Sequence, residues 1–262
     1  MRSLGGDPQY IPDLTYQQFL DFHSRYYHPS NSYIYLYGNM DMEEKLRFLD
    51  QEYLSNYEEL DVDSEIPLQK VFAEVRSLSW DYPIAENEEE SENTYLSYNR
   101  VIGTALDVKL CTAFEVLDYA LLSAPGAPLK KALLGANIGK DIYGSYEDGI
   151  YQPYFSVIAK GSEPHKMEEF QRIIRATLEE IVDKGIDQKA LEAGINYYEF
   201  RYLEADYASF PKGLIYGLDM LDSWLYDANR PFDYLKQLSI FEDLKRRAGE
   251  GYFGGDDDSE YV

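Results

Sequence analysis

Histidine and cysteine, the side chains that most often bind zinc or act as nucleophiles, are scarce in this sequence. It contains His23, His28, His165 and a single cysteine, Cys111. A helical zinc-peptidase site places two histidines on one face, with a glutamate that activates water. His23 and His28 have a spacing that puts them on different sides of a helix, and no acidic residue completes the pattern. We therefore predict no metal ligand among these residues.

Ordinary structural roles account for the same side chains. His28 precedes Pro29 at the end of a predicted helix, where capping or packing is the usual role. His165 lies in the first turn of a helix and is expected at the surface. Cys111 belongs to an apolar helix and has no base beside it in the sequence. We therefore expect it to be buried and to have no role as a nucleophile.

Acidic residues of a predicted hairpin offer the remaining acid–base chemistry. Asp141, Glu147 and Asp148 are candidates, but carboxylates in a hairpin are usually solvated. The glycines of residues 135–144 follow a helix and precede a strand, which is the wrong order for a phosphate-binding loop. No G-x-S-x-G occurs. We accordingly assign no catalytic, cofactor-binding or metal-binding residue.

Charge and composition narrow the class of protein. The 262 residues include 24 basic and 48 acidic ones, for a net charge of -24, and 45% are apolar. Such acidity disfavours nucleic acid and anionic membranes as partners and favours cationic or neutral ones, although solubility alone also explains it. A single cysteine excludes an intrachain disulfide and favours a reducing compartment. No apolar run approaches the roughly 18 residues of a membrane span, and the N-terminus lacks the apolar core of a signal peptide, so we expect a soluble, cytoplasmic protein.

The stretch from 106 to 161 organises the predicted fold. A helix begins near Asp107, and a second one carries Pro128 in its first turn. Two strands follow, at 141–147 and 152–160, joined by an Asp-Gly turn. Helices packed on a hairpin indicate the core of the main domain.

The flanking segments complete an α+β domain. Strands are predicted at 71–82 and 94–103, and four helices follow the hairpin. These helices are expected at 164–184, from 187, along Leu214 to Leu225, and at 232–247. Because hairpins dominate, we expect a largely antiparallel sheet with helices packed on one face.

The N-terminal block, residues 1–60, is predicted to be incomplete. An aromatic helix, an apolar strand at Tyr33–Tyr37 and a second helix make a partial helix–strand–helix layer without partner strands. An unpaired apolar strand predicts self-association through this block. We expect a linker at 61–70, a complete α+β domain at 71–253 and a disordered tail at 254–262.

Several motifs, in order along the chain, resemble one protein family. Residues 3–253 are similar to the presequence protease branch of the insulinase-like (pitrilysin) zinc metallopeptidases. The resemblance rests on Gly5-Gly6-Asp7-Pro8, Tyr26-Tyr27-His28-Pro29-Ser30-Asn31-Ser32, Leu36-Tyr37-Gly38-Asn39-Met40-Asp41, Pro128-Leu129-Lys130-Lys131-Ala132-Leu133, Glu204-Ala205-Asp206, Pro211-Lys212-Gly213-Leu214 and Trp224-Leu225-Tyr226-Asp227.

This resemblance implies a role without catalysis. In that family, homologous α+β domains close around a chamber that degrades unfolded peptides. The zinc motif and the third glutamate ligand match positions upstream of Met1, so zinc belongs to the parent enzyme and none of its ligands maps here. The chain would be the end of the catalytic-type domain plus the whole second, non-catalytic domain. It would be inactive alone and would contribute chamber wall and peptide contacts.

Partners and alternatives follow from the same reading. The expected partners are the remaining domains of the parent peptidase and unfolded peptides. The start at Met1 and the polar tail from Gly254 suggest a fragment. Two alternatives stay open: a stand-alone scaffold that binds peptides or a protein partner, and a hydrolase with an unrecognised carboxylate site.

Overall fold

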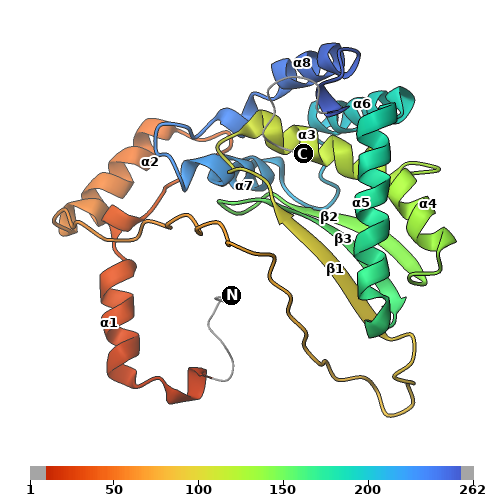
Figure 1. The fold of residues 1–262 in the computed structure, drawn as a ribbon. Coiled ribbons are helices and arrows are strands. Elements are labelled where there is room, and N and C mark those ends of the chain that lie inside the picture. The colour runs from red at the N-terminus through yellow and green to blue at the C-terminus, as the bar shows by residue number, and fades with distance from the viewer. Residues whose placement is uncertain (1–9, 255–262) are drawn as a thin grey trace. The chain divides into compact units, whose positions relative to one another are not determined.

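The computed structural model of the chain describes residues 10–254 (Figure 1). Contacts between residues divide the chain into two compact units, one ending at Ile66 and the other beginning at Pro67. None of the helices in residues 10–254 is long and apolar enough to cross a membrane.

An antiparallel sheet forms the centre of the second unit. It comprises β1 (Thr94–Val101), β2 (Asp141–Glu147) and β3 (Tyr154–Ser162), in the order β1-β3-β2. Ala159 of β3 lies opposite Leu96 of β1 and Ile142 of β2, and all three side chains are buried. Since facing residues share one side of a sheet, this row defines the core face. The predicted hairpin is confirmed, but the connection at 148–153 is longer than the predicted short Asp-Gly turn.

Three helices cover the core face. They are α3 (Val108–Asp118), α4 (Pro128–Gly135) and α5 (Met167–Lys184), and a π-helical turn at Tyr119–Ser123 extends α3. The cluster buried between helices and sheet comprises Leu96, Leu121, Leu122, Leu129, Leu133, Ile138, Ile142, Val157, Ala159, Phe170, Ile173 and Ile174. The helices lie over one face of the sheet (Figure 1). The opposite face carries polar residues such as Asn99 and Ser145, which both pair with Ser156. An antiparallel sheet with helices on one face confirms the α+β prediction.

A second cluster lies beyond α3. It joins α3 to α6 (Gln188–Glu204) and α8 (Leu238–Ala248) and comprises Ala113, Val116, Ala120, Leu191, Ile195, Phe241, Leu244, Ala248 and Phe253. Helix α3 and its π-helical extension therefore contribute to both cores. Helix α7 (Lys212–Trp224) follows α6.

Residues at the ends of α3 and α5 determine where these helices begin or end. The Asp107 side chain accepts a hydrogen bond from the Leu110 amide at 3.0 Å, as its N-cap position predicts. Gly185 ends α5 with a φ of 82°, a left-handed backbone angle that suits glycine. The last helix is shorter than the predicted 232–247. Tyr234, which donates to the carbonyl of Ala105 at 2.9 Å, is held in a separate 3-10 turn by that long-range bond.

The N-terminal unit contains α1 (Tyr16–Tyr26) and α2 (Met42–Phe48). Thr15 and Gln18 form the capping box at the start of α1. Within residues 10–66 no side chain is buried.

Two predicted strands are wrong. Residues 33–37 and 71–82 are extended or irregular chain without strand pairing in the described structure. Apolar and alternating residues make both segments resemble strands, but a strand also needs a partner that accepts its backbone hydrogen bonds. The predicted tail, apart from Gly254, lies outside the described residues.

Candidate functional site

The histidines lie in separate, ordinary environments. The Nδ1 of His28 accepts a hydrogen bond from the Ser30 amide at 3.2 Å, which confirms its capping role. The His23 ring stacks on Tyr27 with centroids 4.6 Å apart. His165 is exposed, as predicted.

Cys111 is buried in α3, as the sequence predicted. Its Sγ lies 3.8 Å from the carbonyl oxygen of Thr104. Burial raises the pKa of the Cys111 thiol, and neighbouring tyrosine hydroxyls only partly oppose this. The thiolate is the nucleophilic form, so a raised pKa makes this cysteine unreactive at neutral pH.

The hairpin carboxylates divide into two kinds. Asp141 is exposed and lies 3.4 Å from the Nζ of Lys130, and Glu147 accepts from the Ser145 hydroxyl at 2.9 Å. These two are solvated, as expected. Asp148, at the turn, is only partly exposed, and burial raises its pKa.

Asp148 belongs to a group of carboxylates that sequence reasoning missed. We use the name carboxylate cluster for Glu115, Asp148, Asp219 and Asp222, whose charges act on one another. Helix α3, the β2–β3 turn and α7 supply these side chains, and each is partly exposed. None of them takes part in an ion pair within residues 10–254. The cluster is therefore a concentration of acidic side chains without an ion-paired cation in the described structure.

Burial and mutual repulsion perturb these groups. Burial, followed by the negative charge of Asp148, raises the pKa of Glu115 to about 8, against a partial opposing effect of Arg201. The same two causes raise the pKa of Asp222 to about 7. A positive charge placed among these carboxylates would reverse the effect, because it favours their ionised form.

Asp118, one turn after Glu115 on α3, has one enclosed carboxylate oxygen. Burial raises its pKa to about 6, and its Oδ1 has no accessible surface and no hydrogen-bond partner in the described structure. This oxygen lies against Gly144 of β2: a Cβ added at residue 144 would stand 1.7 Å from it. Glycine at 144 is what makes room for the carboxylate.

A helical pattern points to the cluster, although only the fold assembles it. Glu115 and Asp118 on α3, and Asp219 and Asp222 on α7, are acidic pairs spaced to share a helix face. Most other residues of both helices are apolar, so an acidic pair there is a departure from the pattern. Sequence alone does not show that Glu115 of α3 and the acidic pair of α7 lie near the turn at Asp148.

The residues present do not fit a zinc ion. Within residues 10–254, no group of three or more His, Cys, Asp or Glu side chains has a geometry that could hold a metal. The carboxylate cluster is included in that statement. Zinc would need three or four such ligands around one point.

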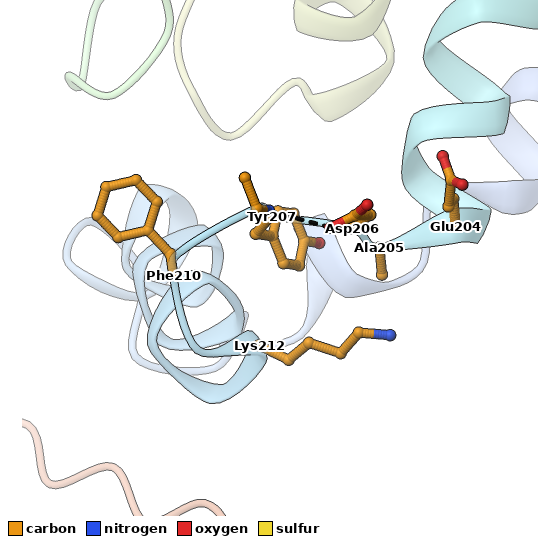
Figure 2. A pocket seen from close by; sticks show the side chains of 7 residues that line it. Glu204, Ala205, Asp206, Tyr207, Phe210 and Lys212 are labelled. Atoms are coloured by element: carbon orange, nitrogen blue, oxygen red, sulfur yellow. Dashed lines mark hydrogen bonds between the residues drawn. The ribbon is translucent and has the colours of Figure 1, made fainter.

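A separate open pocket lies between α6 and α7 (Figure 2). Its volume is about 300 Å³, and its lining includes Glu204, Asp206 and Lys212. Ala205 and Ala208 have φ angles of 45° and 51°, and the Oδ1 of Asp206 accepts from the Ala208 amide at 3.0 Å. This bond stabilises the bend between the helices, and we assign the pocket no chemistry.

Sequence comparison places this fold among peptidases. Residues 13–198 match the family described as the peptidase M16 inactive domain. The chain is 47% identical over 251 residues to Protein HypA of Clostridium perfringens, covering 96% of this chain and 26% of that protein. It is 35% identical over 250 residues to presequence protease 1, chloroplastic/mitochondrial, of Arabidopsis thaliana, covering 94% and 23%. The chain thus spans about a quarter of the length of these relatives.

Structural comparison agrees on the fold. A protease from Helicobacter pylori superposes with a TM-score of 0.60 at 18% identity, over 94% of this chain and 58% of that one. The family match covers most of the chain, and the resemblance to the insulinase-like peptidases inferred from motifs is confirmed. This chain belongs to the peptidase M16 inactive-domain family.

Proposed function

We propose that this chain is the non-catalytic part of a zinc peptidase and that it holds unfolded, positively charged peptide segments for cleavage by the rest of the enzyme. The observation that carries the proposal is the carboxylate cluster, which lies in an inactive-domain fold and has no paired cation. Family resemblance adds the expectation of a chamber wall built with the remaining domains.

The electrostatics favour a cationic side chain over a neutral one. At neutral pH the raised pKa values of Glu115 and Asp222 show that ionisation is unfavourable there. A lysine or arginine side chain would relieve the repulsion and supply donors to the carboxylates. The net charge of -24 would also draw basic peptides toward the protein.

An unfolded peptide suits the site because it can present its side chains singly. Helix α7 and the β2–β3 turn bring Asp222 near Gly149: a Cβ at residue 149 would lie 4.0 Å from Asp222 Oδ1. Tyr151 and Tyr226 stack beside them with centroids 4.3 Å apart. The aliphatic part of a lysine or arginine would pack on such rings while its charge meets the carboxylates.

Peptide binding tests the proposal directly. Fluorescence anisotropy would compare a labelled, unstructured lysine- and arginine-rich peptide with an acidic peptide of equal length. We expect binding of the basic peptide only, weakened roughly tenfold in the double variant Asp219→Asn/Asp222→Asn because two attractive charges are lost.

A charge-matched variant separates the cluster from general attraction. Asp61→Asn/Asp63→Asn removes the same charge from exposed residues of the N-terminal unit. This control should bind like the unsubstituted chain. Equal loss in both double variants, or no preference for the basic peptide, would contradict the proposed site.

The assignment of zinc and cleavage to other parts of the enzyme is tested separately. We expect the purified chain to contain no stoichiometric zinc by elemental analysis. It should also leave unfolded peptides intact by mass spectrometry, because a zinc-bound water and its base are needed for hydrolysis. One tightly held zinc per chain, or chelator-sensitive cleavage that copurifies with it, would overturn this assignment.

A further inference from the structure

Residues 71–82 are an apolar segment exposed to solvent. Leu78 and Trp80 are 68% and 78% exposed, and Val71 and Val75 are 97% and 79% exposed. Leu78, Trp80 and Tyr82 alternate along the chain, as strand residues do. Exposed apolar side chains in such a pattern indicate a segment that gains stability when it finds a sheet edge.

The nearby sheet has a free edge. Strand β1 pairs only with β3 in the described structure. In an antiparallel pair, half of the backbone amides and carbonyls of each strand point away from its partner. The outward groups of β1 therefore form a row able to accept a further strand.

Both ends of the segment are already fixed at the ends of β1. The amide of Gln69 donates to the side chain of Gln152 at 2.6 Å, and Gln152 donates back at 3.3 Å. Gln152 precedes Pro153, whose carbonyl accepts from Ile102, just beyond the last residue of β1. This bond places residue 69 at the C-terminal end of the strand.

The other end lies at the start of β1. The Tyr82 hydroxyl donates to Asn93, and its ring lies 5.9 Å from that of Tyr95. The segment therefore runs in the direction opposite to β1, as Figure 1 shows. It has more residues than the eight of β1, so its length permits pairing along the whole strand.

We propose that residues 71–82 are a strap that closes on the free edge of β1 as a fourth, antiparallel strand. Closure satisfies the outward backbone groups of β1 and places Leu78 and Trp80 beside the side chains of that strand, where cross-strand pairs add stability. The closed strap also occupies the edge that another extended chain would need, so it protects β1 from strand addition by a second copy.

Hydrogen exchange on the full chain tests the strap. Amides in 71–82 should exchange at least about tenfold more slowly than in a Leu78→Pro variant, because proline removes a donor and cannot join a sheet interior. The variant should also expose the outward amides of β1 and leave those of β2 protected. Glu65→Pro, at an exposed coil residue of the N-terminal unit, should change neither.

Three results would overturn the proposal. The first is free exchange of 71–82 in the unsubstituted chain, at the rate found in the proline variant. The second is protection that Leu78→Pro leaves intact, which would assign it to something other than strand pairing. The third is protection that disappears on dilution, which would assign it to pairing between copies.

Discussion

The two units of this chain use similar sequence patterns with different results. Helix α1 presents an aromatic face, on which the ring centroids of Phe22 and Tyr26 lie 4.8 Å apart. Even so, no side chain of residues 10–66 is buried. Helix α5 also has one apolar face, and there Phe170 and Ile174 are almost completely buried. The difference lies in what faces the helix. An amphipathic pattern forms a core only where a second apolar surface meets it.

Replacing a phenylalanine by alanine should reveal the largest difference in stability between the two units. Phe170 is 0% exposed and Phe19 is 57% exposed. We expect Phe170→Ala to lower the free energy of unfolding by about 3–5 kcal/mol, because it leaves a cavity in the first core. Phe19→Ala should change it by less than about 0.5 kcal/mol. Denaturant unfolding followed by circular dichroism measures both, and comparable losses would remove the distinction between the units.

Gly144 tests how tightly the second unit is packed. A Cβ there would meet Asp118 Oδ1 at 1.7 Å and Leu122 at 2.8 Å. We expect Gly144→Ala to cost about 3 kcal/mol of unfolding free energy through overpacking. Adding Asp118→Ala should recover part of this loss, because it removes the clashing carboxylate.

Gly135 supplies the matched control. A Cβ at the end of α4 would meet no atom within 4 Å. Gly135→Ala should therefore be neutral or stabilising by up to about 1 kcal/mol, since alanine favours the helix. If the two alanine variants were equally stable, the close contact between Asp118 and β2 would be wrong.

The carboxylate cluster should give the second unit an unusual pH dependence. The pKa of Glu115 rises from 4.5 to about 8 and that of Asp222 from 3.8 to about 7 on folding. At pH values between the unfolded and folded pKa of each group, the folded chain binds more protons than the unfolded chain. The free energy of unfolding therefore falls as pH rises. Solvent screens these partly exposed groups, so from pH 5 to pH 8 we expect a loss on the order of 2 kcal/mol, well below the sum that the full shifts would give, and a smaller loss in Glu115→Gln.

Asp243 should behave in the opposite way. The hydrogen bond from Lys109, reinforced by Arg246 against the effect of burial, lowers the pKa of Asp243 to about 2. Its contribution to stability is present above its unfolded pKa of 3.8 and is lost as pH falls toward 2. Asp243→Asn should therefore lower the free energy of unfolding at pH 7 without changing how that free energy varies between pH 5 and 8.

A free energy of unfolding that rises from pH 5 to 8 in the unsubstituted chain would contradict the account of the carboxylate cluster.

Local signals explain which parts of the fold the sequence predicted. The cap at Asp107, the stop at Gly185 and the strands on either side of Asp148 depend on residues close together in the chain, and all were found. Residues 33–37 and 71–82 look equally like strands, but pairing depends on a distant partner that no local pattern reveals. The last helix was predicted too long for a similar reason, since the bond from Tyr234 to Ala105 is long-range.

The candidate site was harder to predict than the fold. The roles of His28 and Cys111 follow from their immediate neighbours and were predicted correctly. The cluster needs α3, the turn at Asp148 and α7 to converge, and carboxylates on separate elements carry no shared sequence signature. An acidic pair on an apolar helix, such as Glu115 and Asp118, is the one available signal.

Hydrogen exchange across the whole chain, at several protein concentrations, tests the central claim that only the second unit is a self-sufficient fold. We predict slow exchange for residues of the two cores within 70–250 and fast exchange for residues 10–60 in a monomeric sample. Protection of the N-terminal unit that appears only at high concentration would indicate association between copies, as its exposed aromatic residues favour. Equal protection of both units in a strictly monomeric sample would contradict the account and place the domain boundary elsewhere.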